Sequence, residues 1–253
     1  MSQTIRHPDI LEIAQRQGKV TVEALAEHFG VTLQTIRRDL AELADANKLE
    51  RVHGGAVLPS GTTNIQYEER RNLNEAAKIA ISKACADEIP DGCSIFLNIG
   101  TSTEAVARQL LRHRDLMVVT NNLNVANILI QNSGCSIIVT GGSLRRSDGG
   151  LIGNVTVEAI RQFKFDVAVI GCSAMDADGD LLDFDVEEVG VSQTIIDQSR
   201  KTMLVADHSK LSRSAPVRIA SMRSLDTVFT DAPLPPQLGQ LCAQWDTDVV
   251  VAS

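Results

Sequence analysis

The 253-residue sequence lacks three features that would assign it to a class of protein at once. No apolar run approaches the ~20 residues that a transmembrane helix needs, and the first residues show no apolar segment typical of a secretion signal. The five cysteines are odd in number and have no C-x-x-C spacing, which argues against a disulfide framework and against a zinc site. We therefore expect a cytoplasmic protein whose reduced thiols pack as small core hydrophobes.

The chain also lacks positive charge, with a formal net charge of -8. Residues 1–58 contain seven basic and eight acidic residues, a balance of -1, and the remaining 17 basic and 24 acidic residues give -7. The acidity therefore lies mostly outside the N-terminal segment. A small module of nearly even charge can still bind DNA if its basic groups are displayed on one face.

Motifs for nucleotides and metals are absent as well. The chain has neither a Walker A loop nor a G-x-G-x-x-G segment. The acidic stretch Asp176–Glu188 contains Asp-x-Asp-Gly, but Leu181 and Leu182 occupy interior positions where a calcium loop needs ligands. An acidic hairpin followed by the start of a helix fits this stretch better. We expect no metal ion and no cofactor.

Three helical patterns occupy the first fifty residues. The first covers about 9–17, the second follows Thr21 and ends at Gly30, and the third runs from Thr32 to about Ala46. Threonine is a good N-cap, and glycine after a helix favours the left-handed conformation that ends it. The short connection from Gly30 to Val31 between two capped helices is typical of a helix-turn-helix, here at about residues 20–39.

The third helix places two adjacent arginines away from its apolar side. At about 100° per residue, one side is apolar and Arg38 lies nearly opposite its centre, with Arg37 on the flank. Short polar groups near the N-terminus of such a helix suit base edges, and a flanking cation suits a phosphate. The alternative is a solvated face on which Arg37 pairs with a neighbouring acid. The residues expected on the apolar side are Leu33, Ile36, Leu40 and Leu43.

A small hairpin follows the third helix. Residues 49–52 and 56–58 can form two short strands around His53-Gly54-Gly55, as in the wing of a winged helix. Such a wing would offer cations to a phosphate or a minor groove, although a hairpin that merely closes the small core, with an exposed neutral His53, is an equal interpretation. The residues predicted to contact DNA are Thr32, Gln34, Thr35, Arg37 and Arg38 for the helix and Arg51 and His53 for the wing.

The rest of the chain predicts a second, larger domain. Residues 59–67 are rich in Pro, Gly, Thr and Asn and are interpreted as a linker, so that 1–58 would form a DNA-binding domain and 68–253 an effector-sensing and oligomerisation domain. A helix is expected over about 68–88, after which short β-branched runs alternate with helical patterns. This alternation predicts an α/β fold with a mainly parallel sheet covered on both faces. Ligands in such sheets bind at the C-terminal ends of the strands.

Several loops that leave these strands carry groups suited to an anion or a polyol. Glycine lets backbone N–H groups approach an anion, hydroxyls donate, and a helix N-terminus adds partial positive charge. Each loop also has an ordinary explanation as a cap, a turn or a solvated segment. Together they predict a pocket for a small phosphorylated polyol. The predicted effector-binding residues are Gly100, Thr101, Ser102, Thr103, Asn121, Asn122, Gly142, Arg145, Arg146, Gly149, Gly150 and Lys210.

The stretch from Val20 to Leu58 resembles the N-terminal domain of the DeoR family of bacterial repressors, which has a T-I-R-R-D-L helix followed by H-G-G-A. The later segments GTSTEAVA, VTNNLNVAN, LRRSDGGLIG, LLDFD and VADHSK extend the resemblance over nearly the whole chain. It implies a winged helix-turn-helix joined to a domain related to ribose-5-phosphate isomerase and coenzyme A transferases. Asn98, Ser102 and Leu211 depart from the family, which usually has Asp, Thr and Phe there.

The resemblance also implies partners. They are double-stranded operator DNA, a second copy of the chain in a dimer or tetramer, and a phosphorylated polyol or sugar that releases the DNA, with glycerol 3-phosphate the foremost candidate. An alternative effector is another sugar phosphate.

Two other classes of function remain as alternatives. An isomerase or hydrolase with an attached DNA-binding head would need a general base, for which Asp183, Asp185 and Glu188 are candidates by position only. No catalytic set of residues surrounds them in the sequence, so we expect a regulator and no enzyme. A helix-turn-helix used for protein contact would bind DNA without a steep dependence on salt.

Overall fold

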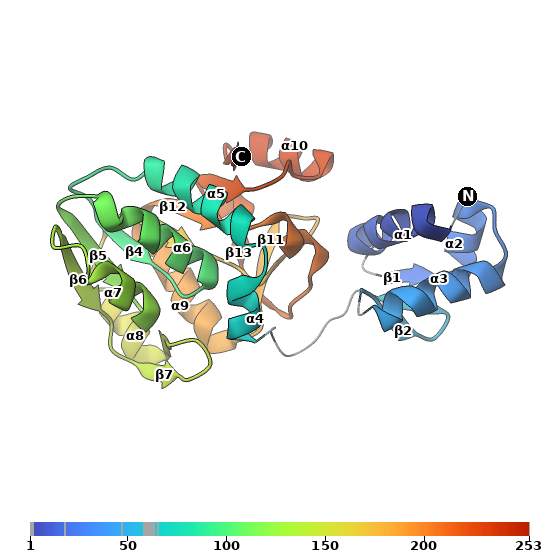
Figure 1. The fold of residues 1–253 in the computed structure, drawn as a ribbon, viewed down its shortest axis with the longest axis horizontal. Coiled ribbons are helices and arrows are strands. Elements are labelled where there is room, and N and C mark those ends of the chain that lie inside the picture. The colour runs from blue at the N-terminus through green and yellow to red at the C-terminus, as the bar shows by residue number, and fades with distance from the viewer. Residues whose placement is uncertain (1–2, 18, 47, 58–63, 65, 253) are drawn as a thin grey trace.

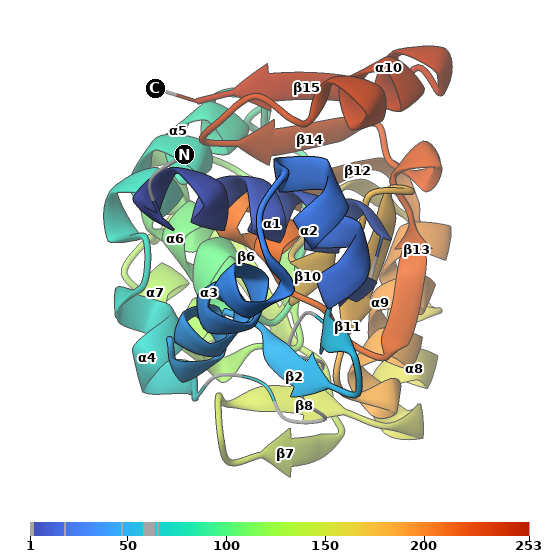
Figure 2. The ribbon, with the colours of Figure 1, turned by 90° about the vertical axis from the view of Figure 1, so that its right-hand side faces the viewer.

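The computed structural model describes residues 3–17, 19–46, 48–57, 64 and 66–252. Figure 1 shows a small N-terminal domain in blue and a larger domain in green to red, and Figure 2 shows the same ribbon turned by 90°. Within the described residues, no helix combines the length and the apolar character that crossing a bilayer requires.

The N-terminal domain is built from helices packed on a short antiparallel sheet. Strand β3 pairs with β1 on one side and with β2 on the other. The predicted helices and hairpin are confirmed, while β1 was not predicted and the first helix begins earlier than expected. The elements are α1 (Gln3–Gln17), β1 (Lys19–Thr21), α2 (Val22–Phe29), α3 (Leu33–Asp45), β2 (Glu50–Val52) and β3 (Gly55–Val57).

Local chemistry fixes the turn between α2 and α3. The Thr21 side chain accepts a hydrogen bond from the Ala24 N–H at 3.2 Å, and Thr32 accepts one from the Thr35 N–H at 3.3 Å. Gly30 ends α2 with φ 62°, a left-handed conformation that side chains other than glycine rarely adopt. The predicted caps and the predicted glycine turn are therefore confirmed.

The small core differs from the prediction at one position. Ile36, Leu40 and Leu43 of α3 are buried with residues of α1, α2 and the sheet, but Leu33 is 42% exposed. Leu33, which the helical period places on the apolar side, is the first residue of α3 and stays outside this core. The fourth buried residue of the helix is Asp39 instead.

The larger domain is organised around a parallel sheet whose described strands run in the order β15-β14-β12-β9-β4-β5-β6. The predicted α/β fold is confirmed. The order reverses between β4 and β9, because the chain adds β5 and β6 on one side and then the later strands on the other. The strands are β4 (Ser94–Leu97), β5 (Leu116–Thr120), β6 (Cys135–Val139), β9 (Phe165–Ile170), β12 (Ser199–Val205), β14 (Thr227–Thr230) and β15 (Asp248–Val251).

Helices cover both faces of this sheet, as the alternation in β4 shows. Ile95 and Leu97 pack in the core with α5, α6 and α7, whereas Phe96 packs on the opposite face with α8, α9 and α10. The buried parallel strands are therefore apolar on both sides. The helices are α5 (Glu75–Asp87), α6 (Thr101–Gln109), α7 (Leu123–Leu129), α8 (Asn154–Ile160), α9 (Val186–Asp197) and α10 (Pro236–Gln244).

The antiparallel parts of this domain were predicted only in part. The hairpin of β10 (Ala174–Met175) and β11 (Asp180–Asp183), followed by α9, confirms the acidic hairpin and helix start expected over Asp176–Glu188. The hairpin of β7 (Ser143–Arg145) and β8 (Gly150–Ile152) and the pairing of β11 with β13 (Val217–Ser221) were not predicted. The helix expected over 68–88 is broken into α4 (Tyr67–Asn72) and α5. Asn74 lies between them with φ 52° and donates a hydrogen bond to Asp207 at 2.8 Å, so a tertiary contact holds the break.

The cysteines agree with the expectation of reduced thiols. All five are free, and Cys135 alone of the five is less than fully buried. Burial raises the pKa of the Cys172 thiol to about 12, so this thiol stays protonated and unreactive near neutral pH.

Candidate functional site

The exposed side of α3 presents the polar groups that the sequence placed there. Gln34, Arg37 and Arg38 are exposed, and Thr35 is half-buried. Thr32 and Thr35 hold each other through a hydroxyl–hydroxyl hydrogen bond of 2.9 Å, so this pair orders the first turn of the helix. A helix that enters a major groove by its N-terminal residues would lead with this turn.

The two arginines differ in their surroundings. Arg38 Nε lies 3.3 Å from Glu42 Oε1, one turn along the helix. Among the described residues Arg37 has no ion pair, so the alternative in which Arg37 pairs with a neighbouring acid applies to Arg38 instead. The Arg38–Glu42 contact is exposed, and such pairs contribute little to stability, so either arginine can turn to a phosphate or a base.

Asp39 has a role that the sequence did not reveal. It is fully buried, and Arg6 of α1 donates to both of its carboxylate oxygens, at 2.8 and 3.2 Å. This bidentate ion pair joins α1 to the buried side of α3. The aspartate of the R-R-D segment therefore positions the helix, while the arginines that precede it face outward.

The wing has the expected form. Arg51 and His53 are exposed on the hairpin of β2 and β3. Gly55 is a packing requirement, because a Cβ at this position would collide with the carbonyl of Val20 in β1. The hairpin therefore closes the small core and also presents cations, so the structure is compatible with both interpretations of the wing.

A polar cavity of about 290 Å³ lies in the larger domain beside the C-terminal ends of the main strands. The chain reverses its strand order there, between β4 and β9, which is where ligands bind in open α/β sheets. Its volume is at the low end for ligand sites and suits a small molecule. Its lining residues are Asn64, Gln66, Tyr67, Arg70, Arg145, Ser147, Asp148, Asp183, Phe184, Asp185 and Glu188.

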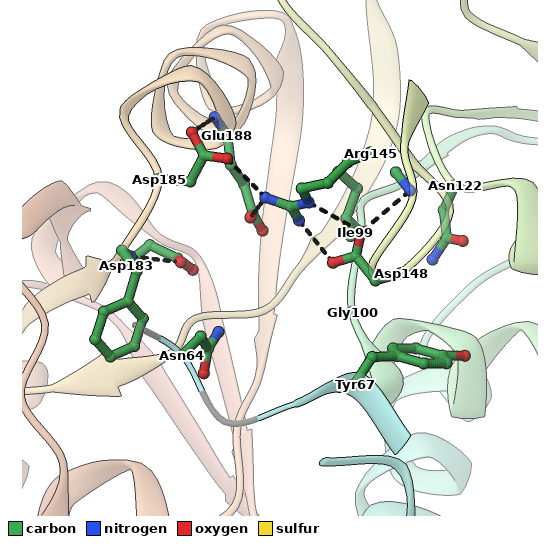
Figure 3. Close-up of polar contacts among 12 residues, drawn as sticks. Asn64, Tyr67, Ile99, Gly100, Asn122, Arg145, Asp148, Asp183, Asp185 and Glu188 are labelled. Atoms are coloured by element: carbon green, nitrogen blue, oxygen red, sulfur yellow. Dashed lines mark hydrogen bonds and ion pairs between the residues drawn. The ribbon is translucent and has the colours of Figure 1, made fainter. Parts of the chain in front are cut away.

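Arg145 is surrounded by carboxylates in this cavity (Figure 3). Its Nε and Nη2 donate to the two oxygens of Asp148 at 2.9 and 2.7 Å. Its Nη1 lies 2.9 Å from Asp185 Oδ2 and 2.6 Å from Glu188 Oε2. Arg145, which the sequence predicts as an effector-binding cation, is therefore already paired with three carboxylates, and its contact with an effector stays a prediction.

Two carboxyl groups of the cavity are protonated more readily than usual. Burial and, to a smaller extent, the neighbouring Asp183 carboxylate raise the pKa of Glu188 to about 7, against the opposing effect of Arg145. Burial also raises the pKa of Asp183, despite the hydrogen bond that it accepts from the Phe184 N–H. This pair therefore holds a proton over part of the neutral range, and it can both donate to and accept from a hydroxyl group.

The segment that precedes α5 forms one wall of the cavity. Asn64 donates to Ser173 Oγ at 2.9 Å, and the Tyr67 hydroxyl donates to Glu104 Oε2 at 2.8 Å. Arg70 Nη2 lies 3.4 Å from Asp148 Oδ2. Polar contacts therefore hold three side chains of this wall against the rest of the larger domain.

A basic cluster lies next to the cavity and shares Arg70 with it. The positive charge of Arg70 lowers the pKa of the cluster's other three members, and the carboxylate of Asp207 acts on the same three in the opposite direction. Arg70 Nε and Arg213 Nη1 are buried and have no hydrogen-bond partner among the described residues. The N-terminus of α6 adjoins the cluster, because Thr101 Oγ1 donates to the Arg70 carbonyl at 3.5 Å. The cations of the cluster are Arg70, Lys78, Lys210 and Arg213.

The pKa values report mutual repulsion in this cluster. Burial, together with the charges of Lys210, Arg213 and Arg70, lowers the pKa of Lys78 to about 8, while Asp207 opposes these effects. Burial and the charge of Arg213 likewise lower the pKa of Lys210. A bound dianion would accept hydrogen bonds from Arg70 Nε and Arg213 Nη1, which lack a partner among the described residues, and would relieve this repulsion.

The other predicted effector residues are divided between exposed loops and internal contacts. Arg146 and Gly142 are exposed, and Ser102 is half-buried at the start of α6. Thr103 donates to the Asn98 carbonyl at 2.6 Å. A Cβ at Gly150 would collide with Ile99, and Gly149 adopts φ 75° in the turn of the hairpin.

The two asparagines after β5 also make internal hydrogen bonds. Asn121 donates to the Leu151 carbonyl at 3.1 Å, and Asn122 accepts from the Asn124 N–H at 2.9 Å as the N-cap of α7. Of the predicted residues, Lys210 belongs to the basic cluster, and Thr101 contacts it through the Arg70 carbonyl.

Sequence reasoning missed Arg70, Lys78 and Arg213. Lys78 left a signal, because it shares one face of α5 with the buried Ile81, Ser82 and Cys85. A lysine on the buried face of a helix indicates a specific partner or a ligand. Arg70 and Arg213 lie on segments whose meeting depends on the tertiary fold, and nothing local marks them.

Comparison with known proteins assigns the chain to a family. The model described as "DeoR-like helix-turn-helix domain" matches residues 6–62, and the model described as "DeoR C terminal sensor domain" matches residues 73–232. The chain belongs to the DeoR family. The helix-turn-helix and the sensor domain of this DeoR protein correspond to the small and the large domains in Figure 1.

Relatives of this DeoR protein are similar over almost its whole length. A protein of Escherichia coli (strain K12) described as "Glycerol-3-phosphate regulon repressor" is 48% identical over 95% of this chain and 96% of its own. A protein of Haemophilus influenzae with the same description is 46% identical over 91% of this chain and 90% of its own. A solved ribose 5-phosphate isomerase of Methanocaldococcus jannaschii shares 13% identity over 54% of each chain with a TM-score of 0.40, a likeness too distant to indicate a function.

Proposed function

We propose that this DeoR protein is an operator-binding repressor of glycerol 3-phosphate metabolism that releases DNA when a phosphorylated polyol, foremost glycerol 3-phosphate, binds its sensor domain. Residues 1–58 bind DNA in the bacterial cytoplasm, and residues 68–253 bind the effector and a second copy of the chain. The relatives described as glycerol-3-phosphate regulon repressors support the regulon, and the basic cluster beside a polar cavity supports the chemistry of the ligand.

The basic cluster is the observation that carries the effector proposal. Four cations around one carboxylate, with unpartnered guanidinium N–H groups of Arg70 and Arg213, match a phosphate dianion. The N-terminus of α6 adds backbone N–H groups and partial positive charge. The polyol chain then extends into the cavity, where Asp183 and Glu188 meet its hydroxyl groups.

The wall formed by Asn64 and residues 66–70 gives the effector a route to the DNA-binding domain. These residues comprise the end of the predicted linker and the start of α4, and Asn64, Gln66, Tyr67 and Arg70 line the cavity. An effector that engages Arg70 competes with its contact to Asp148 and so shifts the segment from which the linker leaves. Typical coupling of about 1–3 kcal/mol between two sites changes an affinity by about 5–150-fold.

Binding of a duplex selected from a random DNA pool, followed by fluorescence anisotropy at fixed salt, tests the proposal. Addition of glycerol 3-phosphate should weaken binding by at least about fivefold, while unphosphorylated glycerol should have no effect. Tight DNA binding that no concentration of glycerol 3-phosphate changes would overturn the effector assignment. Because half-sites mirror the symmetry of the protein, the selected duplex should contain repeated half-sites.

One observation supports a second candidate function, that of an enzyme. Glu188 has a pKa of about 7 in the cavity, which is the property of a general base near neutral pH. Its ion pair with Arg145 at 2.6 Å also explains this carboxyl group as part of an internal network. Recovery of glycerol 3-phosphate and ribose 5-phosphate unchanged after long incubation with the protein would exclude turnover of these compounds.

A further inference from the structure

The cavity and the basic cluster form two halves of opposite charge. In the acidic half, four carboxylates surround the single cation of Arg145, whose Nε, Nη1 and Nη2 all donate already. In the basic half, four cations surround the carboxylate of Asp207. Arg70 joins the halves, because it belongs to the basic cluster and contacts the acidic half. The acidic carboxylates are those of Asp148 and Asp183, which are about 95% buried, and of Asp185 and Glu188.

From this division we infer that the site accepts ligands with one anionic group and rejects those with a second anionic group at the far end. This inference rests on the proposed function, since it assumes that a phosphate occupies the basic half. It names the ligand class more narrowly: a phosphorylated polyol or neutral sugar binds, whereas a phosphorylated hydroxy acid or a bisphosphate of similar length does not.

The chemistry of the far end of the ligand decides the selectivity. A hydroxymethyl group donates a hydrogen bond to a carboxylate, whereas a carboxylate in the same place has no proton to donate and carries a like charge. Arg145 offers no compensation, because Asp148, Asp185 and Glu188 already hold it. For unit charges about 5 Å apart at an effective dielectric constant of about 20, the repulsion lowers the affinity by roughly 250-fold. Because the carboxyl pair is partly protonated, the expected loss of affinity is smaller, at least about tenfold.

Isothermal titration calorimetry of the full chain with two matched ligands tests the inference. Glycerol 3-phosphate and 3-phosphoglycerate, both as racemates, share the phosphate, the chain length and the C2 hydroxyl, and they differ in a hydroxymethyl against a carboxylate. We expect 3-phosphoglycerate to bind at least about tenfold more weakly. Equal affinities for the two ligands would show that the proposed selectivity is wrong and would leave the proposed function standing. Absence of glycerol 3-phosphate binding would overturn the proposed function, and this inference with it.

A matched pair of variants on α9 locates the source of the selectivity. Glu188→Gln removes one charge of the acidic half and keeps a side chain of similar size, so the ratio of the two affinities should fall. Glu187→Gln removes an exposed charge one residue away and should leave the ratio unchanged. If the ratio of the two affinities is the same in both variants, the charge of Glu188 is not the source of the selectivity.

A pH series needs no variant and covers the case in which Glu188→Gln does not fold. The groups that face Glu188 are Asp183 from β11, Asp185 before α9, and Arg145 and Asp148 from the hairpin of β7 and β8. As pH falls through about 7, Glu188 takes up a proton, so the ratio of the affinities for glycerol 3-phosphate and 3-phosphoglycerate should decrease. Both ligands carry the same phosphate, so its titration affects the two affinities equally and leaves their ratio unchanged. A ratio that is constant or widens on acidification would contradict the inference.

Discussion

Replacement of Lys210 by methionine separates a ligand-binding role from a structural one. Lys210 belongs to a cluster of four cations around one carboxylate, and burial together with Arg213 lowers its pKa. A charged hydrogen bond to a phosphate contributes about 1.5–3 kcal/mol, so Lys210→Met should weaken glycerol 3-phosphate binding by roughly 10- to 150-fold. The same change removes repulsion inside the free protein, so its melting temperature should stay the same or rise.

Calorimetry and thermal melting together provide the assay. Lys201→Met is the matched control, since Lys201 lies in β12, whose opposite end leads to Lys210, and it is 38% exposed beside Glu88. The control should change neither the affinity nor the melting temperature appreciably. If Lys210→Met lowers the melting temperature and leaves the affinity intact, Lys210 is a structural residue and the phosphate lies elsewhere.

Three further predictions concern the DNA-binding surface, the domain core and pH. Arg37→Ala should reduce the slope of log affinity for DNA against log salt by about 1, as loss of one phosphate contact does, whereas Arg161→Ala, at the exposed residue after α8, should leave the slope unchanged; equal slopes in both would contradict the role of Arg37. Asp39→Asn should lower the melting temperature of the N-terminal domain and weaken DNA binding, because it breaks the buried ion pair, while the exposed Asp45→Asn on the same helix should do neither; circular dichroism and anisotropy measure the two effects. Affinity for glycerol 3-phosphate should fall as pH rises through about 8, because Lys78 then loses the proton that attracts the phosphate; calorimetry that shows constant or rising affinity over this range would refute a role for Lys78.

The N-terminal domain was predictable because its signals are local. Two threonine caps, a glycine with positive φ and a helical period of apolar residues determine α2, α3 and the turn between them without reference to the rest of the chain. The error at Leu33 has the same origin. Periodicity places a residue on a side of a helix, but it does not say how far the neighbouring core extends along that helix.

The order of strands and helices in the sensor domain was also predictable, and the break before α5 was not. Short buried strands and amphipathic helices give a periodic pattern of apolar residues in the sequence. The left-handed conformation of Asn74 depends instead on a hydrogen bond to Asp207, which is distant in the chain. Weak two-residue strands such as β10 form only where the fold supplies a partner.

For the proposed site, the sequence indicates a place in the fold but not which of its charges are available to a ligand. Loops at the C-terminal ends of parallel strands meet by topology, so the approximate place followed from the sequence. Which charges remain available for a ligand depends on pairing in three dimensions. Arg145 looked available and is held by three carboxylates, while Arg70 and Arg213 gave no signal and carry unpartnered N–H groups.

The most direct test of the account compares release of DNA by glycerol 3-phosphate in the wild type and in Lys210→Met. The account predicts that the ligand weakens wild-type binding to the selected duplex by at least about fivefold, and that the variant binds the duplex equally well but needs at least about ten times more ligand for release. Wild-type binding that saturating glycerol 3-phosphate leaves unchanged would contradict it, as would release of the variant at the wild-type concentration.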